Sequence, residues 1–97
     1  MEAIDRKFRF TAVSLSSGRK HTHADAIVFL AKDALLPDLL DKYLALCSAA
    51  QVDERQIKGV QLLKDRVLTY QRSNIKKVRM PDVNAGKEEK RICKPNK

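Results

Sequence analysis

PDLLDKYLALCSAAQVDERQIKGVQLLKDRVLTYQR, residues 37–72, sets the architecture of this 97-residue chain, because its apolar side chains recur with helical spacing in two blocks. Pro37 suits the first turn of a helix and disfavours helical backbone at the residue before it. The apolar stripe that follows, with spacing i, i+3, i+4 and i+7, consists of Leu40, Tyr43, Leu44 and Cys47. The first block therefore predicts one amphipathic helix that starts near Pro37.

The second block predicts a longer helix over residues 54–72, with Asp53 as its N-cap. Its apolar residues occupy a sector of the helical wheel roughly 160° wide. They are Ile57, Val60, Leu63, Val67, Leu68 and Tyr70. Gln51 and Val52 form the short link, so we expect the two helices to pack as an antiparallel pair.

The residues before this pair predict a β-hairpin over residues 7–22. Phe8, Phe10, Val13 and Leu15 mark the first strand, and the turn formers Ser16, Ser17 and Gly18 follow it. Thr22 has the character of a helix N-cap, and Asp25 is an acidic residue suited to the first turn. A short helix through residue 31 is therefore expected, with a strand over residues 27–30 as the alternative.

Together these elements predict an α+β fold. An N-terminal β-hairpin packs on an antiparallel helical pair, with or without a short helix before the pair, and a basic tail follows. Residues 75–83 alternate bases with apolar side chains and predict an extended arm, whereas residues 84–97 have the composition of a disordered segment. The expected domain organisation is a compact domain over residues 1–74 and a basic arm and tail over residues 75–97.

The positive charge lies at the two ends of the chain, whose formal net charge is +8. Five bases face two acids in residues 1–23, and eight bases face three acids in residues 76–97. The middle is balanced, with seven of each. Clustered cations create a field that attracts an anionic partner, so the ends predict a site for nucleic acid or another phosphate-bearing ligand. The candidate binding residues are Arg6, Lys7, Arg9, Arg19, Lys20, Lys76, Lys77 and Arg79.

The outer face of the second helix predicts a different site, for an acidic protein. Arg55, Lys58, Leu62 and Arg66 share one side of the helical wheel, and Leu62 there points away from the core stripe. One apolar side chain among cations is more typical of a protein contact than of bare phosphate binding. A helix-turn-helix is a further alternative, but the link lacks the glycine often found in that turn.

No catalytic motif or phosphate-binding glycine loop occurs, so the chain is expected not to be an enzyme and to use no cofactor. The Ser16–Lys20 turn offers N–H groups and two cations to a phosphate. The same residues are also typical of an ordinary hairpin turn, and we favour that interpretation. His21 and His23 share a face on a strand, yet a zinc site needs about four ligands, so no metal is expected.

The two cysteines and the lack of a long apolar run indicate the cellular location of the chain. Cys47 lies on the apolar side of the first helix and Cys93 in the basic tail, so no disulfide framework is predicted. The longest apolar run has six residues, far short of the ~20 that span a membrane. We therefore expect a cytoplasmic protein. The compact layout and basic tail suit a small regulator or accessory protein of the type that phages and plasmids carry, either monomeric or a homodimer.

Overall fold

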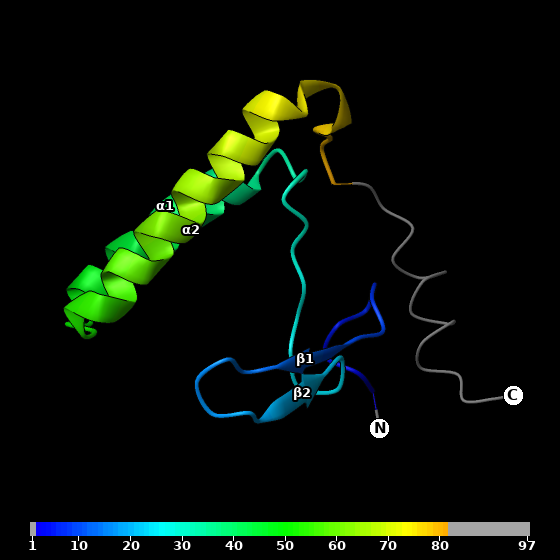
Figure 1. The fold of residues 1–97 in the computed structure, drawn as a ribbon, viewed down its shortest axis with the longest axis vertical. Helices are drawn as coiled ribbons and strands as arrows, with labels where there is room; N and C mark the ends of the chain where they lie inside the picture. Colours follow the sequence, from blue (N-terminus) through cyan, green and yellow to red (C-terminus); the bar gives the residue numbers. More distant parts are fainter. Residues whose placement is uncertain (1, 82–97) are drawn as a thin grey trace, which may run out of the picture. The chain divides into compact units, whose positions relative to one another are not determined.

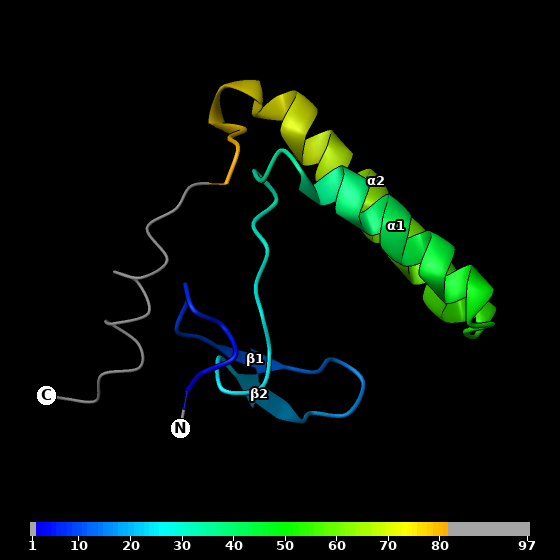
Figure 2. The same ribbon diagram turned by 180° about the vertical axis from the view of Figure 1, so that it is seen from behind.

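The computed structural model describes residues 2–81, which fall into two compact units, residues 2–28 and Phe29–Pro81. The first unit contains a two-stranded antiparallel β-hairpin and the second a pair of packed helices (Figures 1 and 2). These elements agree with the predicted α+β class. The packing of the hairpin on the helical pair stays a prediction, and the predicted disordered tail with Cys93 lies outside the described residues.

The hairpin consists of strands β1 (Thr11–Val13) and β2 (Lys20–Thr22), with Thr11 opposite Thr22 and Val13 opposite Lys20. Gly18 takes a φ of +74° in the turn, a conformation that costs glycine little. The strands are shorter than the predicted 7–22 hairpin. The reason is that the N–H groups of Lys7 and Phe8 each donate to Asp5 Oδ1 at 2.8 Å instead of joining a strand ladder.

The predicted short helix after Thr22 is wrong, and so is its alternative, a strand over residues 27–30. Residues 26–30 have no regular secondary structure. The N–H of Val28, which in a helix donates to the carbonyl four residues earlier, donates here to Asp5 Oδ2 at 2.8 Å. The Thr22 N–H donates to Asp25 Oδ1. The two residues that predicted a helix N-terminus therefore form a turn that does not continue into a helix.

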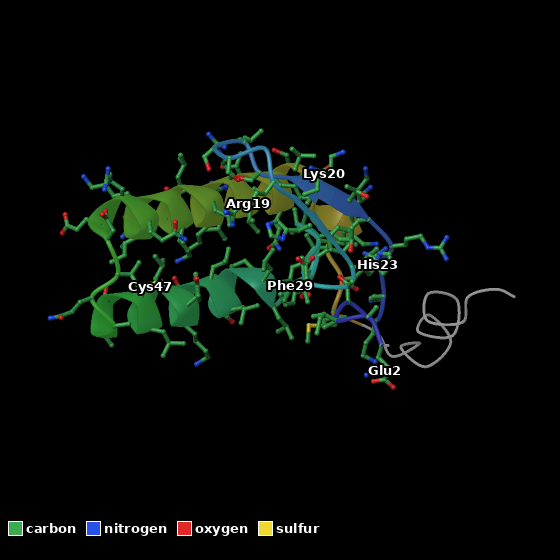
Figure 3. All side chains as sticks on the ribbon, turned by 90° about the horizontal axis from the view of Figure 1, so that it is seen from below. Glu2, Arg19, Lys20, His23, Phe29 and Cys47 are labelled. Carbon is green, nitrogen blue, oxygen red and sulfur yellow. The ribbon has the colours of Figure 1, made fainter. Side chains whose placement is uncertain are left out.

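Helices α1 (Leu36–Ala49) and α2 (Glu54–Ser73) run antiparallel side by side, as predicted (Figure 1). Their buried contact consists of Leu36, Leu40, Val60 and Val67, with Leu44 packed against it. Cys47 is also buried, as its place on the apolar stripe predicts (Figure 3). Within the described residues, an ion pair between Lys64 Nζ and Asp41 Oδ1 also joins the two helices. The described core is therefore a thin layer of aliphatic side chains.

Three aromatic or aliphatic residues expected in this core are exposed instead, namely Tyr43, Leu63 and Tyr70. They lie beside the buried row of their helix rather than on it. A helix that packs against one neighbour buries a stripe about 100° wide, whereas the apolar sector of α2 is wider than that. Each helix therefore covers only part of the apolar sector of the other, and the rest of both sectors is exposed.

The link between the helices ends α1 with a Schellman motif. Val52 N–H donates to the Cys47 carbonyl at 3.0 Å, and Gln51 N–H donates to the Ser48 carbonyl at 3.1 Å. This geometry places Gln51 at a φ of 58°, in the left-handed region that favours glycine. Asp53 then caps α2 as predicted, because its carboxylate accepts the N–H of Arg55 at 2.8 Å.

Within the second unit, the segment before α1 is hydrogen-bonded to the end of α2 and to the segment that follows it. Gln71 Nε2 donates to the carbonyls of Ala31 and Asp33, at 3.0 and 2.8 Å. After the 3₁₀ turn η1 (Ile75–Lys77), Arg79 pairs its backbone with Lys32 and Ala34. Residues 75–81 thus belong to the second unit. The predicted division at residue 74 is not decided by the described residues and stays a prediction.

We predict that Gln51→Gly stabilises the helical pair by about 0.5–1 kcal/mol, because glycine adopts the left-handed conformation without the steric penalty of a Cβ. The measurement is urea unfolding followed by circular dichroism at 222 nm. Gln51→Ala is the matched control and should give no gain, since alanine keeps the Cβ. A lower stability for the glycine variant would contradict the proposed strain.

Candidate functional site

The hairpin unit is organised around a buried carboxylate. Asp5 is only 4% exposed, and its two oxygens accept the three N–H groups of Lys7, Phe8 and Val28. Burial by itself raises the pKa of the Asp5 carboxyl. The three hydrogen bonds and the nearby His23 ring outweigh that effect, and the pKa of Asp5 is lowered. Asp5 is therefore held as an anion that joins the segment before β1 to the segment after β2.

His23 completes this junction. Its carbonyl accepts the N–H of Asp5 at 3.0 Å, and its ring lies edge-on to Phe10 with the ring centres 6.3 Å apart. The buried Nδ1 atom of His23 has no hydrogen-bond partner in the described part of the chain. The two ends of the hairpin are thus joined by contacts of one carboxylate, one imidazole and one phenyl ring.

Two of the predicted phosphate-binding residues lie on the hairpin itself. They are Arg19 in the turn and Lys20 on β2, and both are exposed (Figure 3). Within residues 2–81, the side chains of Lys7, Arg19 and Lys20 have no carboxylate partner. Asp5 is occupied by backbone N–H groups, and Asp25 is occupied by Thr22 and His21. The Lys7, Arg19 and Lys20 side chains are therefore not neutralised by Asp5 or Asp25.

Lys7 and Arg9 both precede β1, so neither lies on a strand, although both fall within the predicted 7–22 hairpin. Arg6 and Arg9 are exposed, and each has an interaction partner in the structure. The five predicted residues of the hairpin unit are thus surface residues on the hairpin and on the segment leading into it. They do not form one row along a strand.

Three backbone N–H groups of the Ser16–Lys20 turn donate within the hairpin. Gly18 N–H donates to the Ser14 carbonyl at 2.9 Å, Ser17 N–H to Ser14 Oγ at 3.3 Å, and Arg19 N–H to Ser17 Oγ at 3.2 Å. A phosphate cradle needs such N–H groups to be available. The turn is therefore an ordinary hairpin turn, and its contribution to anion binding comes from side chains.

His21 and His23 have separate partners. His21 Nδ1 lies 2.9 Å from Asp25 Oδ2, and this hydrogen bond, followed by that from the Thr22 N–H, lowers the pKa of Asp25. Among residues 2–81 no group of three or more His, Cys, Asp or Glu side chains gathers in a way that would hold a metal ion.

The other three predicted phosphate-binding residues, Lys76, Lys77 and Arg79, belong to the second unit. Lys76 and Lys77 are exposed in η1. The Arg79 guanidinium donates to the carbonyls of Lys76 and Val78, at 2.6 and 3.0 Å, and so caps the 3₁₀ turn. Part of its hydrogen-bonding capacity is therefore used to shape the segment that carries the two lysines.

The predicted protein-binding residues are all exposed on α2. Arg55 is engaged by the N-cap, since its Nη2 lies 2.8 Å from Asp53 Oδ2; the pair raises the pKa of Arg55 and lowers that of Asp53. Leu62 is 51% exposed. Neither Lys58 nor Arg66 has a side-chain partner within the described residues. The helix-turn-helix alternative is not supported, because α1 and α2 lie side by side along their length (Figure 2).

One surface was missed by the sequence reading. Leu39, Tyr43 and Leu46 of α1 are exposed, as are Leu63 and Tyr70 of α2. The signal was present in the apolar sectors, which are wider than one helix neighbour covers. Tyr43, Leu63 and Tyr70 were predicted to be core, and Leu39 and Leu46 were assigned to no surface.

The helices of residues 2–81 include none with the length and apolar character needed to cross a lipid bilayer. Comparisons of the chain with protein families, with curated proteins and with solved structures find no match. The functional interpretation therefore depends on the surfaces described above.

We expect the hairpin unit to lose its order in acid. The lowered pKa of Asp5 means that the folded unit favours the anion, so this stabilisation is complete above the unfolded pKa of about 4 and is lost as the pH falls through the folded value. Amide shifts of Lys7, Phe8 and Val28, followed by NMR from pH 7 to pH 2, measure the loss.

Asp5→Asn should remove most of this acid dependence and weaken the unit at neutral pH, because the amide replaces one acceptor oxygen by a donor. Glu2→Gln is the control, since Glu2 is exposed. If Asp5→Asn keeps the same acid transition as the original chain, another group controls it.

Proposed function

We propose that this chain is a small non-enzymatic binding protein that engages nucleic acid or another phosphate-rich ligand through its basic ends. The observation that carries the proposal is electrostatic. The Lys7, Arg19 and Lys20 side chains are exposed without a carboxylate partner in the described residues, while the aspartates of that unit are held by other groups. The positive field of the hairpin is therefore available to a ligand.

Side chains of this kind bind the phosphate backbone and release condensed counterions. Three N–H groups of the turn, those of Ser17, Gly18 and Arg19, are used within the hairpin, so a polyanion that meets several cations at once suits it better than a small phosphate ester. Such contacts position a ligand but read little sequence. The expected activity is therefore salt-dependent binding with weak sequence preference, in a cytoplasmic accessory role. We also propose a cytoplasmic location, in either a monomeric or a homodimeric state.

The test is a titration of fluorescent duplex DNA, single-stranded DNA and RNA with the full chain at two salt concentrations. If six of the predicted cations contact phosphates, the log–log slope of affinity against salt should be near −5, by the rule of about −0.9 per contact. The double variant Arg19→Glu/Lys20→Glu should reduce that slope by about 2 units.

Lys32→Glu/Arg72→Glu is the matched control, because it makes the same change in net charge at exposed positions outside the predicted set. An equal loss of affinity in both double variants would show that only net charge matters. Absence of binding to all three nucleic acids at low salt would rule the proposal out.

A second candidate function is supported by the outer side of α2. There Lys58 and Arg66 lack described partners, and Leu62 is exposed on the same helix. On this proposal the chain is a phage- or plasmid-type regulator or inhibitor that holds an acidic protein through Arg55, Lys58, Leu62 and Arg66. The apolar side chain gives a point of contact that phosphate binding does not require.

For this second candidate we predict that Leu62→Glu abolishes capture of acidic proteins, because a carboxylate then faces the acidic partner. Quantitative affinity capture from cell extract measures this effect. Nucleic-acid affinity of the same variant should fall much less, which separates the two functions. Unchanged protein capture by Leu62→Glu would discard the second candidate.

A further inference from the structure

Large apolar side chains are exposed on both helices of the pair. Five of them are Leu39, Tyr43 and Leu46 on α1 and Leu63 and Tyr70 on α2; Leu62 of α2 is also exposed but lies on the outer side of that helix. From their exposed fractions, these five side chains offer on the order of 500 Å² of accessible surface, which is at the upper end of the largest apolar patches on monomeric proteins. Patches of this size on soluble proteins are often interaction sites.

The helical geometry places all five on the same side of the pair. On the wheel of α1, the three exposed residues lie about 60–120° to one side of Leu40, while Asp41 lies about 100° to the other. On the wheel of α2, Leu63 and Tyr70 lie about 60–80° from Val60, in the same sense of rotation as the exposed residues of α1 from Leu40. Lys64 lies in the opposite sense, as Asp41 does on α1.

Asp41 and Lys64 form an ion pair between the helices. The side of α1 that carries Asp41 and the side of α2 that carries Lys64 therefore face the same way. The sides that carry the exposed apolar residues therefore also face the same way. We call this surface the apolar face, defined by Leu39, Tyr43, Leu46, Leu63 and Tyr70.

The space over the apolar face allows close approach. Gly59 lies in the same row of α2 as Leu63 and Tyr70, four residues before the first and eleven before the second. A Cβ built at Gly59 would have no atom within 4 Å. Two antiparallel helices about 20–30 Å long thus present a shallow apolar surface with low relief at this point, which is the shape that accepts a third helix.

The charge around the apolar face is of one sign. The charged helix residues that border it are Lys42, Arg55 and Arg66, all bases. The acids of the two helices, Asp38, Asp41, Glu54 and Asp65, lie toward the opposite side, where bases also occur. Arg55 is paired with Asp53, but Lys42 and Arg66 have no ion-pair partner within the described residues.

We propose that the apolar face binds an acidic amphipathic helix of a partner protein. The apolar stripe of that helix would cover the five side chains, and its flanking carboxylates would meet Lys42 and Arg66. A second copy of this chain fits less well, because an isologous contact would bring the same basic rims together without acids between them. The inference goes beyond the second candidate function, since it includes α1 and places the centre of contact at Leu63 rather than at Leu62.

The test uses the full chain and two fluorescein-labelled helical peptides of 18 residues. Both carry leucines at the 3–4 spacing of an amphipathic helix; one has flanking glutamates and the other has lysines at the same positions. Fluorescence anisotropy should show binding of the acidic peptide at least ~10-fold tighter than of the basic one, and the difference should shrink with salt. Equal binding of the two peptides, or no binding of the acidic one, overturns the proposal.

Leu62 and Leu63 form a matched pair for locating the contact, because they are 51% and 50% exposed on the same helix. Leu63→Gln, and Leu46→Gln on α1, should each weaken the acidic peptide by at least ~5-fold, whereas Leu62→Gln stays within ~2-fold. The reverse order would overturn the apolar face and leave the second candidate function standing. Circular dichroism checks that each variant keeps its helix content.

Charge reversal and self-association complete the test. Arg66→Glu should weaken the acidic peptide more than Arg72→Glu, which makes the same charge change on the opposite side of α2. Sedimentation equilibrium measures whether the original chain dimerises. A dimer that Leu63→Gln converts to monomer would show that a second copy covers the face and would overturn the proposed partner.

Discussion

The contact between α1 and α2 is one layer of aliphatic side chains, and this limit shapes the rest of the helical unit. Leu36 and Leu40 meet Val60 and Val67, and no large aromatic residue is buried between them in the described residues. Two helices can hide only one stripe each. The remaining apolar side chains of both helices have to be exposed or to be covered by something else. A small domain with so thin a core has little stability to spare.

The hairpin unit is held together in a different way. Its strands are three residues long, and Val13 and Leu15 are exposed, so little of its order comes from apolar burial. Asp5 supplies the order instead, because one carboxylate satisfies three backbone N–H groups from two segments. A charged group in this position is favourable only when its hydrogen bonds are complete. These hydrogen bonds occupy the Asp5 carboxylate, and the nearby Lys7 side chain stays exposed without a carboxylate partner in the described residues.

The elements that the sequence predicted well are those governed by local rules. The spacing of Leu40 and Leu44, the Asp53 cap and the short Gln51–Val52 link were sufficient for the helical pair, and Gly18 for the hairpin turn. The Thr22 and Asp25 signal failed because a residue far away in sequence, Asp5, takes the N–H of Val28. Tyr43, Leu63 and Tyr70 were assigned to the core because periodicity tells which side of a helix is apolar, but not how many neighbours cover it. Of the predicted site residues, charge clustering located exposed cations, while the commitment of Arg79 to backbone carbonyls depends on the conformation of η1.

Charge and apolar surface contribute differently to recognition by such a molecule. A net charge of +8 on 97 residues draws any polyanion toward the chain and raises the rate of encounter, but it selects little among anions. An apolar surface selects by shape, because a partner must bury Tyr43 and Leu63 without leaving its own polar groups unpaired. The Lys42 and Arg66 side chains beside that surface then add discrimination by sign. Nucleic acid satisfies the first of these requirements and not the second, whereas an acidic amphipathic helix satisfies both. The hairpin cations and the helical face are therefore suited to different ligands, even though both ligands are anionic.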